Sequence, residues 1–196
     1  MEDQPGTILG IDELILRPWR PTDAAAVLAA CQDPEIARWV AIPQPYLPAD
    51  ADAFIESALA MWRDGNGAPF AIVEAETDRL LGAVTRFGPE GHQATFGCWL
   101  VPEARGRGIG TRSLRLLAEW TFATTSAFRL DVFIMVGNEA SESMVEHAGF
   151  QREGVLRAWD VHHDDVPVDC VVYSRLRSDS QVAAPLIVTG GVTEGT

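Results

Sequence analysis

Hydrophobic residues recur with a helical period in two long stretches of the chain. In Ala49–Arg63 the apolar side chains lie three or four positions apart, and in Gly108–Ala123 they form one apolar face. Two shorter helices are also expected. Asp23–Gln32 is rich in alanine and follows a proline, whereas Glu139–Ala148 is followed by Gly149, which suits the left-handed residue after a helix.

A further short helix and a loop are expected in Asp33–Pro48, because four prolines interrupt this stretch. Short β-prone runs bounded by turn residues predict the strands. Three of them follow one another without a helix between, so the middle of the chain should be an antiparallel meander. The strands are expected at Leu14–Leu16, Pro69–Glu74, Leu80–Phe87, Ala94–Leu100, Arg129–Val136, Val155–Val161 and Val168–Leu176.

The resulting order, β-α-α-β-β-β-α-β-α-β-β, predicts an α/β (α+β) fold in which a mixed, mostly antiparallel central sheet carries helices on both faces. No repeat or linker divides the chain, so we expect one domain over residues 12–177. Residues 1–11 read as a polar lead, and residues 178–196 as a flexible tail. Within that tail, Ala183–Val188 could pair weakly with another segment, but no strand is predicted there.

The composition is that of an ordinary soluble globular protein. Hydrophobic residues make up 47% and charged residues 22% of the chain. No apolar run approaches the ~20 residues that a membrane-spanning helix needs. The N-terminus lacks the basic and apolar blocks of a signal peptide, so we expect no membrane partner and a cytoplasmic location.

Charge and residue usage exclude several classes of function. A formal net charge of −13 argues against nucleic acid as a partner, because phosphate binding needs a basic surface, and it is compatible with a cationic substrate such as an amine. All 15 basic residues are arginine, so lysine-dependent chemistry is excluded. The three cysteines lie far apart without a Cys-x-x-Cys pair, which indicates reduced thiols and no metal site.

One short segment carries the strongest sign of chemistry. A predicted strand ends at Leu100, a glycine-rich turn follows, and a helix begins near Gly108. Glycines at alternate positions leave backbone N–H groups uncovered, and the helix adds its unpaired N–H groups and the positive end of its dipole. Together with two arginines, this arrangement suits a pyrophosphate. The segment comprises Arg105, Gly106, Arg107, Gly108, Ile109, Gly110 and Thr111.

Two common phosphate loops do not fit this segment. A Rossmann G-x-G-x-x-G pattern counted from Gly106 would require glycine where Thr111 stands, and it should open a βαβ unit rather than follow a meander. A Walker loop requires a lysine. A glycine-rich turn that only caps a helix is the structural alternative.

The remaining pattern, R-G-x-G-x-G after a strand, resembles the acyl-CoA pyrophosphate loop of the GNAT acetyltransferases, with Arg105, Gly108 and Gly110 at its defining positions. The resemblance covers residues 12–177 and points to the Rim-type branch, the ribosomal-protein N-terminal acetyltransferases and their small-molecule relatives. Further matching segments occur in the same order: Leu14–Pro18 with Pro21–Ala24, Asp33–Ile36, Asn138-x-x-Ser141, Ala148–Phe150, Glu153–Arg157 and Tyr173.

The resemblance implies an acyl-CoA-dependent N-acyltransferase that moves an acetyl group from acetyl-CoA, its co-substrate, to a primary amine by direct attack on the thioester. The loop would hold the CoA, and Asn138 would bind its pantetheine amide, cap the following helix, or do both. A backbone N–H near Leu100 and Val101 would polarise the carbonyl as its oxyanion forms. Dimers are common among relatives, so the resemblance leaves a homodimer open.

Two residues are candidates for proton transfer. Many relatives use a tyrosine to protonate the leaving thiolate, but Val145 stands at that position. The resemblance to the Rim-type branch implies Ser141 as the acid instead, and a serine there could equally cap the helix. Asp160 stands where the same branch often has glutamate, and it is the candidate base.

The acceptor pocket is expected in the Asp33–Pro48 segment, with Trp39 and Tyr46 as aromatic walls; core packing is the alternative for each of them. Transfer of a larger acyl group such as succinyl, or a non-catalytic acyl-CoA-binding regulatory module, would also fit the resemblance. A nucleotide-dependent oxidoreductase is disfavoured by the failed Rossmann pattern. The acceptor itself stays open between a protein N-terminus, a polyamine, an amino acid and an aminoglycoside.

Overall fold

The computed structural model describes residues 7–162, 165–179 and 187–189. Within these residues nine strands form one sheet in the order β7-β8-β6-β5-β4-β3-β2-β1-β9. β5 and β6 are parallel neighbours and the other pairs are antiparallel, which confirms the expected mixed, mostly antiparallel sheet. The strands are β1 (Thr7–Ile11), β2 (Leu14–Pro18), β3 (Gly67–Glu74), β4 (Leu80–Phe87), β5 (Gln93–Leu100), β6 (Arg129–Met135), β7 (Gln151–Val161), β8 (Pro167–Leu176) and β9 (Ile187–Thr189).

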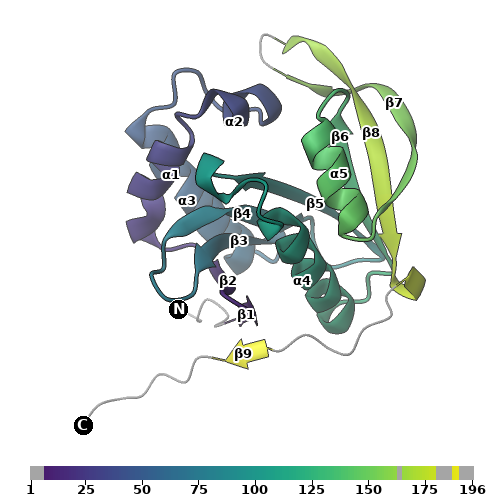
Figure 1. The fold of residues 1–196 in the computed structure, drawn as a ribbon, viewed down its shortest axis with the longest axis horizontal. Helices are drawn as coiled ribbons and strands as arrows, with labels where there is room; N and C mark the ends of the chain where they lie inside the picture. Colours follow the sequence, from purple (N-terminus) through teal and green to yellow (C-terminus); the bar gives the residue numbers. More distant parts are fainter. Residues whose placement is uncertain (1–6, 163–164, 180–186, 190–196) are drawn as a thin grey trace.

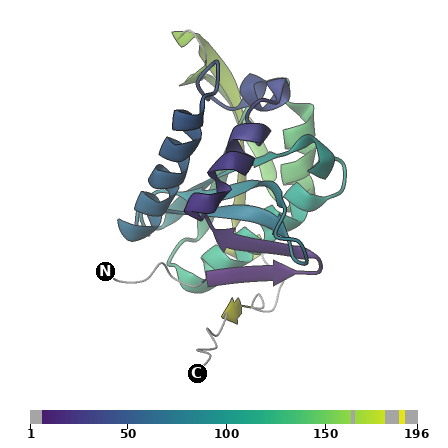
Figure 2. The same cartoon turned by 90° about the vertical axis from the view of Figure 1, so that its left-hand side faces the viewer.

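Helices cover both faces of this sheet, as expected (Figures 1 and 2). The alternation along β3 separates the two layers. Phe70 and Ile72 enter the hydrophobic cluster beneath α4 and α5, whereas Ala71 and Val73 enter the cluster beneath α1, α2 and α3. Among the described residues, no helix combines the length and apolarity needed to cross a bilayer. The helices are α1 (Ala24–Ala30), α2 (Pro34–Trp39), α3 (Pro48–Arg63), α4 (Ile109–Thr124) and α5 (Glu139–His147).

β5 and β6 stay paired over only part of their length. Their parallel register ends at Phe96 opposite Val132. Beyond that point β5 remains paired with β4 as far as Leu100, and β6 remains paired with β8 as far as Met135. The two strands therefore separate toward their carboxyl ends, and the sheet has an opening in its middle.

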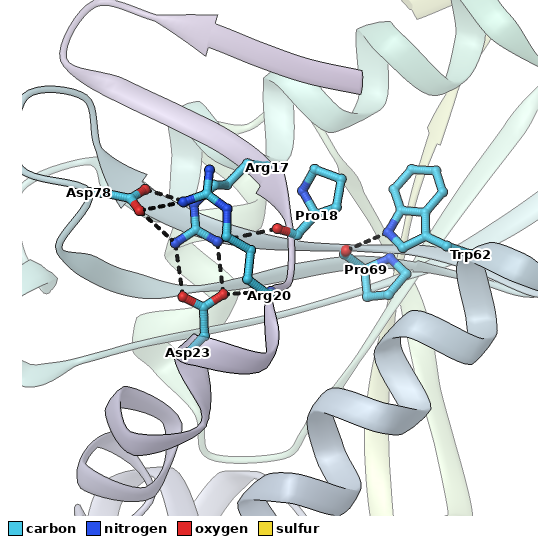
Figure 3. A network of polar contacts seen from close by, with 7 residues as sticks. All are labelled: Arg17, Pro18, Arg20, Asp23, Trp62, Pro69 and Asp78. Atoms are coloured by element: carbon cyan, nitrogen blue, oxygen red, sulfur yellow. Dashed lines mark hydrogen bonds and ion pairs between the residues drawn. The ribbon is translucent and has the colours of Figure 1, made fainter. Parts of the chain in front are cut away.

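A buried arginine anchors the α1–α3 layer to the sheet (Figure 3). Arg17 on β2 donates two hydrogen bonds to the carboxylate of Asp23, which precedes α1, at 2.8 and 2.9 Å. Its Nε donates to Asp78, in the turn between β3 and β4, at 2.7 Å. Nearby, Trp62 of α3 donates to the carbonyl oxygen of Pro69 at 2.9 Å. These bonds fix the helices that form one wall of the site.

The two ends of the chain differ from the expectation. Thr7–Ile11, assigned to the polar lead, forms β1, because the turn at Asp12, with φ of 52°, returns the chain into β2. Leu9 is fully buried in this hairpin. Ile187–Thr189, in the expected tail, pairs with β1 as β9. The rest of that tail beyond Asp179 lies outside the described residues, and so do residues 1–6.

Candidate active site

A cavity of about 1240 Å³ occupies the opening between β5 and β6 and reaches both faces of the sheet. The glycine-rich loop, α4 and α5 line one half of the cavity, which we call the loop half. Helices α2 and α3 line the other half, which we call the α2–α3 half. Cys98 and Ile134 pack toward α4, so their neighbours Trp99 and Phe133 project to the α2–α3 half. Two ligands could therefore meet in this cavity from opposite faces of the sheet.

The glycine-rich loop presents bare backbone to the loop half. Gly106 and Gly108 have φ of 70° and 69°, a left-handed conformation that favours glycine. A Cβ atom added at either position would meet no heavy atom within 4 Å, so the space above the loop is open. α4 begins at Ile109, and its first N–H groups have no acceptor within the helix. This geometry suits an anion.

Gly110, also predicted to bind phosphate, lines the cavity and has a packing role as well. A Cβ atom at this position would overlap the side chain of Met144 on α5. Thr111 donates a hydrogen bond from Oγ1 to the Met144 carbonyl oxygen at 3.3 Å. The start of α4 is thus held close to α5, which shapes the loop half.

The two arginines of the loop are engaged by the protein. Arg105 forms an ion pair with Asp33 at the start of α2, and it donates to the carbonyl oxygen of Leu100 at 3.0 and 3.2 Å. Arg107 is exposed and donates to the Glu103 carbonyl oxygen at 3.3 Å, and it is not among the residues that line the cavity. Arg105 therefore joins the loop to α2, with its charge balanced by Asp33.

Two further arginines on α4 line the cavity, and sequence analysis did not single them out. Arg112 pairs with Glu13 at 2.8 Å. Arg115 donates to the carbonyl oxygen of His147, at the end of α5. Of the cavity-lining arginines, Arg115 has no carboxylate partner within the described part of the chain, so no carboxylate there compensates its positive charge.

The end of β5 presents one backbone amide to the opening. The N–H of Val101 donates to the Leu81 carbonyl oxygen at 3.0 Å and is therefore occupied. Backbone groups alternate in direction along an antiparallel pair, so the N–H and carbonyl of Leu100 point away from β4, toward the separated β6. Arg105 indeed reaches the Leu100 carbonyl from that side. Of the two predicted residues, Leu100 presents its N–H to the cavity and Val101 does not.

At the start of α5, one residue caps the helix and another presents a hydroxyl group to the cavity. Asn138 is the N-cap, and its Oδ1 accepts a hydrogen bond from the Ser141 N–H at 3.1 Å. Ser141 lines the cavity, and its hydroxyl has no hydrogen-bond partner among the described residues. The capping alternative for Ser141 therefore does not describe its side chain. Val145, one turn further on, is fully buried.

Asp160 lines the α2–α3 half of the cavity. It stands opposite Val168 of β8, and both face α2, because Val171 of the same strand packs toward α5. The register slips just before Asp160, where Ala158 has φ of 50° and donates its N–H to Asp169 Oδ1 at 2.8 Å. Regular pairing of β7 with β8 resumes at Asp160 after this bulge. The Asp160 side chain lies on the face of the sheet opposite to that of Ser141.

Of the two residues predicted as aromatic walls of the acceptor pocket, one lines the cavity and the other does not. Trp39 lines the cavity, and its Nε1 donates to Glu35 at 3.3 Å. Tyr46 is not brought to the cavity: it is buried in the core beneath α1 and α3, beside Cys31, and burial raises its pKa. Core packing, the stated alternative, is correct for Tyr46, because its loop folds back over α1.

Phe54, Trp99 and Phe133 also line the α2–α3 half, and no sequence pattern marked them as site residues. Each has the spacing of a core residue in its own helix or strand. The alternation of side chains along a strand could have placed Trp99 and Phe133 on the same face of the sheet, but only with the register of β5 against β6 already known.

Two other residues that match the family pattern, Glu153 and Tyr173, form ion pairs or hydrogen bonds within the protein. Glu153 forms an ion pair with Arg129 at 2.7 Å and accepts a hydrogen bond from Ser174; these contacts lower the pKa of Glu153 to about 2. Tyr173 is buried and donates to Glu142 at 2.8 Å, and burial together with this carboxylate raises its pKa. Neither residue lines the cavity.

Known proteins share this architecture. Residues 13–151 match the family described as Acetyltransferase (GNAT) domain. The relative named "Uncharacterized N-acetyltransferase YoaA", from Bacillus subtilis, is 27% identical over 169 residues, which cover 85% of this chain and 95% of that protein. The fold is similar to that of Mycobacterium smegmatis RimJ in complex with CoA-disulfide, with a TM-score of 0.80, 21% identity, and coverage of 92% of this chain and 93% of the other.

A second solved structure, the microcin C7 self-immunity acetyltransferase MccE in complex with acetyl-CoA and AMP, has a TM-score of 0.77 and 22% identity, with 85% of this chain and 93% of the other covered. These similarities in fold agree with the family match, which spans most of the chain. The chain belongs to the GNAT acetyltransferases, a family of acyl-CoA-dependent N-acetyltransferases.

Proposed function

We propose that this protein transfers the acetyl group of acetyl-CoA to a primary amine by direct attack of the amine on the thioester. One observation carries the proposal: a single cavity joins the glycine-rich loop on one face of the sheet to the α2–α3 half on the other. In this arrangement the thioester lies in the opening between β5 and β6, and the amine reaches it from the opposite face.

The loop half would hold the CoA. The amides of Gly106, Gly108 and the first turn of α4 would bind the pyrophosphate, favoured by the helix dipole. Arg115 lies two turns along α4, about 9 Å from the start of the helix at 1.5 Å per residue. That separation suits the 3′-phosphate of CoA better than the pyrophosphate, and Arg115 brings an uncompensated charge to it.

The Leu100 N–H would polarise the thioester carbonyl. It points into the opening where the acyl group would lie, and a single aligned donor to a developing oxyanion is worth about 3 kcal/mol. The surrounding side chains in the opening are apolar, which strengthens this interaction by excluding water.

Asp160 and Ser141 would handle the protons from opposite faces. Asp160 would accept a proton from the ammonium group in the α2–α3 half, directly or through water, leaving a neutral amine. The amine then attacks the carbonyl carbon, and the tetrahedral intermediate collapses with cleavage of the C–S bond. Ser141 would protonate the departing thiolate from the loop half and regain a proton, through water, from the positively charged nitrogen of the intermediate, giving the amide, free CoA and the restored hydroxyl.

Succinyl transfer is the second candidate, and the chain offers it less support. A succinyl carboxylate would extend past Leu100 toward the α2–α3 half, where the charged side chains lining the cavity are Glu35 and Asp160. Like charges would oppose it. Acetyl is therefore the acyl group that the lining favours.

The test measures thiol release from acetyl-CoA and from succinyl-CoA, with and without a panel of primary amines. We expect amine-dependent release from acetyl-CoA. Acetyl-CoA should also raise the melting temperature, whereas NADPH and ATP should not. Binding of acetyl-CoA without transfer to any amine would instead identify an acyl-CoA-binding module, and stabilisation by a dinucleotide alone would contradict the proposed cofactor.

A further inference from the structure

The α2–α3 half of the cavity is walled by aromatic and aliphatic side chains from four separate elements. Trp39 comes from α2, Phe54 from α3, Trp99 from β5 and Phe133 from β6, with Ile36 between them. Such a wall recognises an apolar group by area and shape rather than by hydrogen bonds.

Most of these rings are held in place from behind. Trp19, which is fully buried, stacks on Trp99 with ring centroids 6.4 Å apart and contacts Phe54 edge-on at 5.1 Å. Trp159 stacks on Phe133 at 4.9 Å. Packing against buried Trp19 therefore restricts Trp99 and Phe54 before a ligand binds, which reduces the entropy cost of binding.

Trp39 is held in a different way, by its own helix. Its Nε1 donates to Glu35 at 3.3 Å, and the Arg38 guanidinium lies 4.7 Å from its ring centroid. The polar edge of this ring is thus satisfied within α2, Arg38 covers one face of it, and the rest of its apolar surface is left for a ligand.

The charges of this half are negative. Glu35, Asp160 and His162 line it, and Glu35 is paired with Arg38 at 3.5 Å, so Asp160 is its carboxylate without an arginine partner among the described residues; the arginines that line the cavity, Arg105, Arg112 and Arg115, all come from the loop and α4. Arg38 of α2 is engaged by Glu35 and the Trp39 ring and does not line the cavity, so a carboxylate on the acceptor would meet Asp160 and no unpaired arginine among the described residues that line this half. An ammonium group, in contrast, would lie between carboxylates and aromatic faces, both of which attract cations.

We infer that the acceptor is a small primary amine that carries an apolar group of aromatic size and no carboxylate. The inference rests on the proposed acetyl transfer and specifies its second substrate. Amino acids are opposed by the carboxylate of Asp160, and aminoglycosides and polyamines lack the apolar group that the walls would cover. A protein N-terminus would have to place its polar backbone against the same apolar walls.

The test compares amines that differ in one group each. The panel is 2-phenylethylamine against phenylalanine, tryptamine against tryptophan, and ethylamine, spermidine and a C-terminally amidated alanine-serine peptide, all at saturating acetyl-CoA. We expect kcat/KM for 2-phenylethylamine to exceed that for phenylalanine by about 100-fold, because the added carboxylate meets like charge. Ethylamine should be a poor substrate through a high KM.

Variants of Trp39 test whether this ring is responsible for the preference for an aromatic amine. Trp39→Ala should raise the KM for 2-phenylethylamine about tenfold, by loss of aromatic contact area, and should lower kcat/KM for 2-phenylethylamine more than kcat/KM for ethylamine, while the Kd of acetyl-CoA stays unchanged. Trp39→Phe should restore most of the lost affinity. Phe128→Ala is the matched control, because that ring is 55% exposed and does not line the cavity.

The outcomes distinguish this inference from the function on which it rests. Preferred acetylation of phenylalanine, spermidine or the peptide would overturn the inference and leave acetyl transfer intact. A preference for 2-phenylethylamine that Trp39→Ala leaves unchanged would overturn the assigned walls. Tight binding of acetyl-CoA with no transfer to any amine would overturn both the inference and the proposed function.

Discussion

Asn138 accepts a hydrogen bond on its Oδ1 from the backbone N–H of Ser141, at 3.1 Å, at the start of α5. The capping function therefore belongs to Asn138, and the Ser141 hydroxyl is left to face the cavity. This division of roles allows the chemistry of Ser141 to be tested apart from the stability of its helix.

Ser141→Ala should lower kcat by about 100-fold, the range of a positioned general acid, with the Kd of acetyl-CoA and the melting temperature nearly unchanged. Asn138→Ala is the matched variant: it should reduce the free energy of unfolding by about 1 kcal/mol through loss of the cap. Steady-state kinetics and thermal unfolding on both variants suffice. Full activity of a well-folded Ser141→Ala protein would remove Ser141 from the mechanism.

Gly108→Asp should abolish binding of acetyl-CoA, because a carboxylate would occupy the open space above the loop and repel the pyrophosphate. Gly65→Asp is a close control. Gly65 has the same φ of 69°, also has no atom within 4 Å of an added Cβ, and lies at the end of α3 away from the cavity. Calorimetry should show normal binding for the control. Equal binding by both variants would mean that the loop is only a turn.

Arg115→Gln should weaken acetyl-CoA binding about tenfold, since a hydrogen-bonded charge contributes roughly 1.5 kcal/mol or more. The same variant should bind dephospho-CoA as the parent protein does, because that ligand lacks the 3′-phosphate. Arg112→Gln, whose parent side chain is paired with Glu13, should lose less. A loss for CoA and dephospho-CoA alike would assign Arg115 to the pyrophosphate instead.

Glu153→Gln should lower stability at neutral pH and have a smaller effect in acid. The pKa of Glu153 in the folded protein is about 2, because Arg129 and Ser174 stabilise its charged form. That value lies below the ~4.3 of an unfolded chain, so the contribution is present above pH ~4.3 and is lost as the pH falls toward 2. Its size is limited, because Glu153 is 41% exposed.

Thermal unfolding of the two proteins between pH 7 and pH 2 checks this prediction. The difference in melting temperature should narrow across the acid range, and Glu56→Gln, on the exposed side of α3, should show no such trend. A constant difference at every pH would show that the ion pair with Arg129 contributes nothing through its charge.

Local patterns were sufficient for most of the fold. The helical period of Gly108–Ala123 and the β-prone run before it predicted α4 and β5, because the apolar face of an element is written within its own residues. The hairpin of β1 and β2 was missed, since Thr7–Ile11 is short and its pairing depends on the turn at Asp12. β9 was not assumed for a similar reason: it acquires a partner only because β1 forms an edge.

Some features of the candidate site were likewise predictable from local sequence, and others were not. Residue type and spacing over a few positions were enough to identify the glycine-rich loop before α4, the Asn138-x-x-Ser141 segment and the family. The folded chain was needed to show that Leu100 rather than Val101 faces the opening, and that Tyr46 belongs to the core. It also decided which arginines already have carboxylate partners. The first of these outcomes follows from the separation of β5 from β6, and the others follow from contacts between elements far apart in the chain, which leave no trace in the residue spacing within any one element.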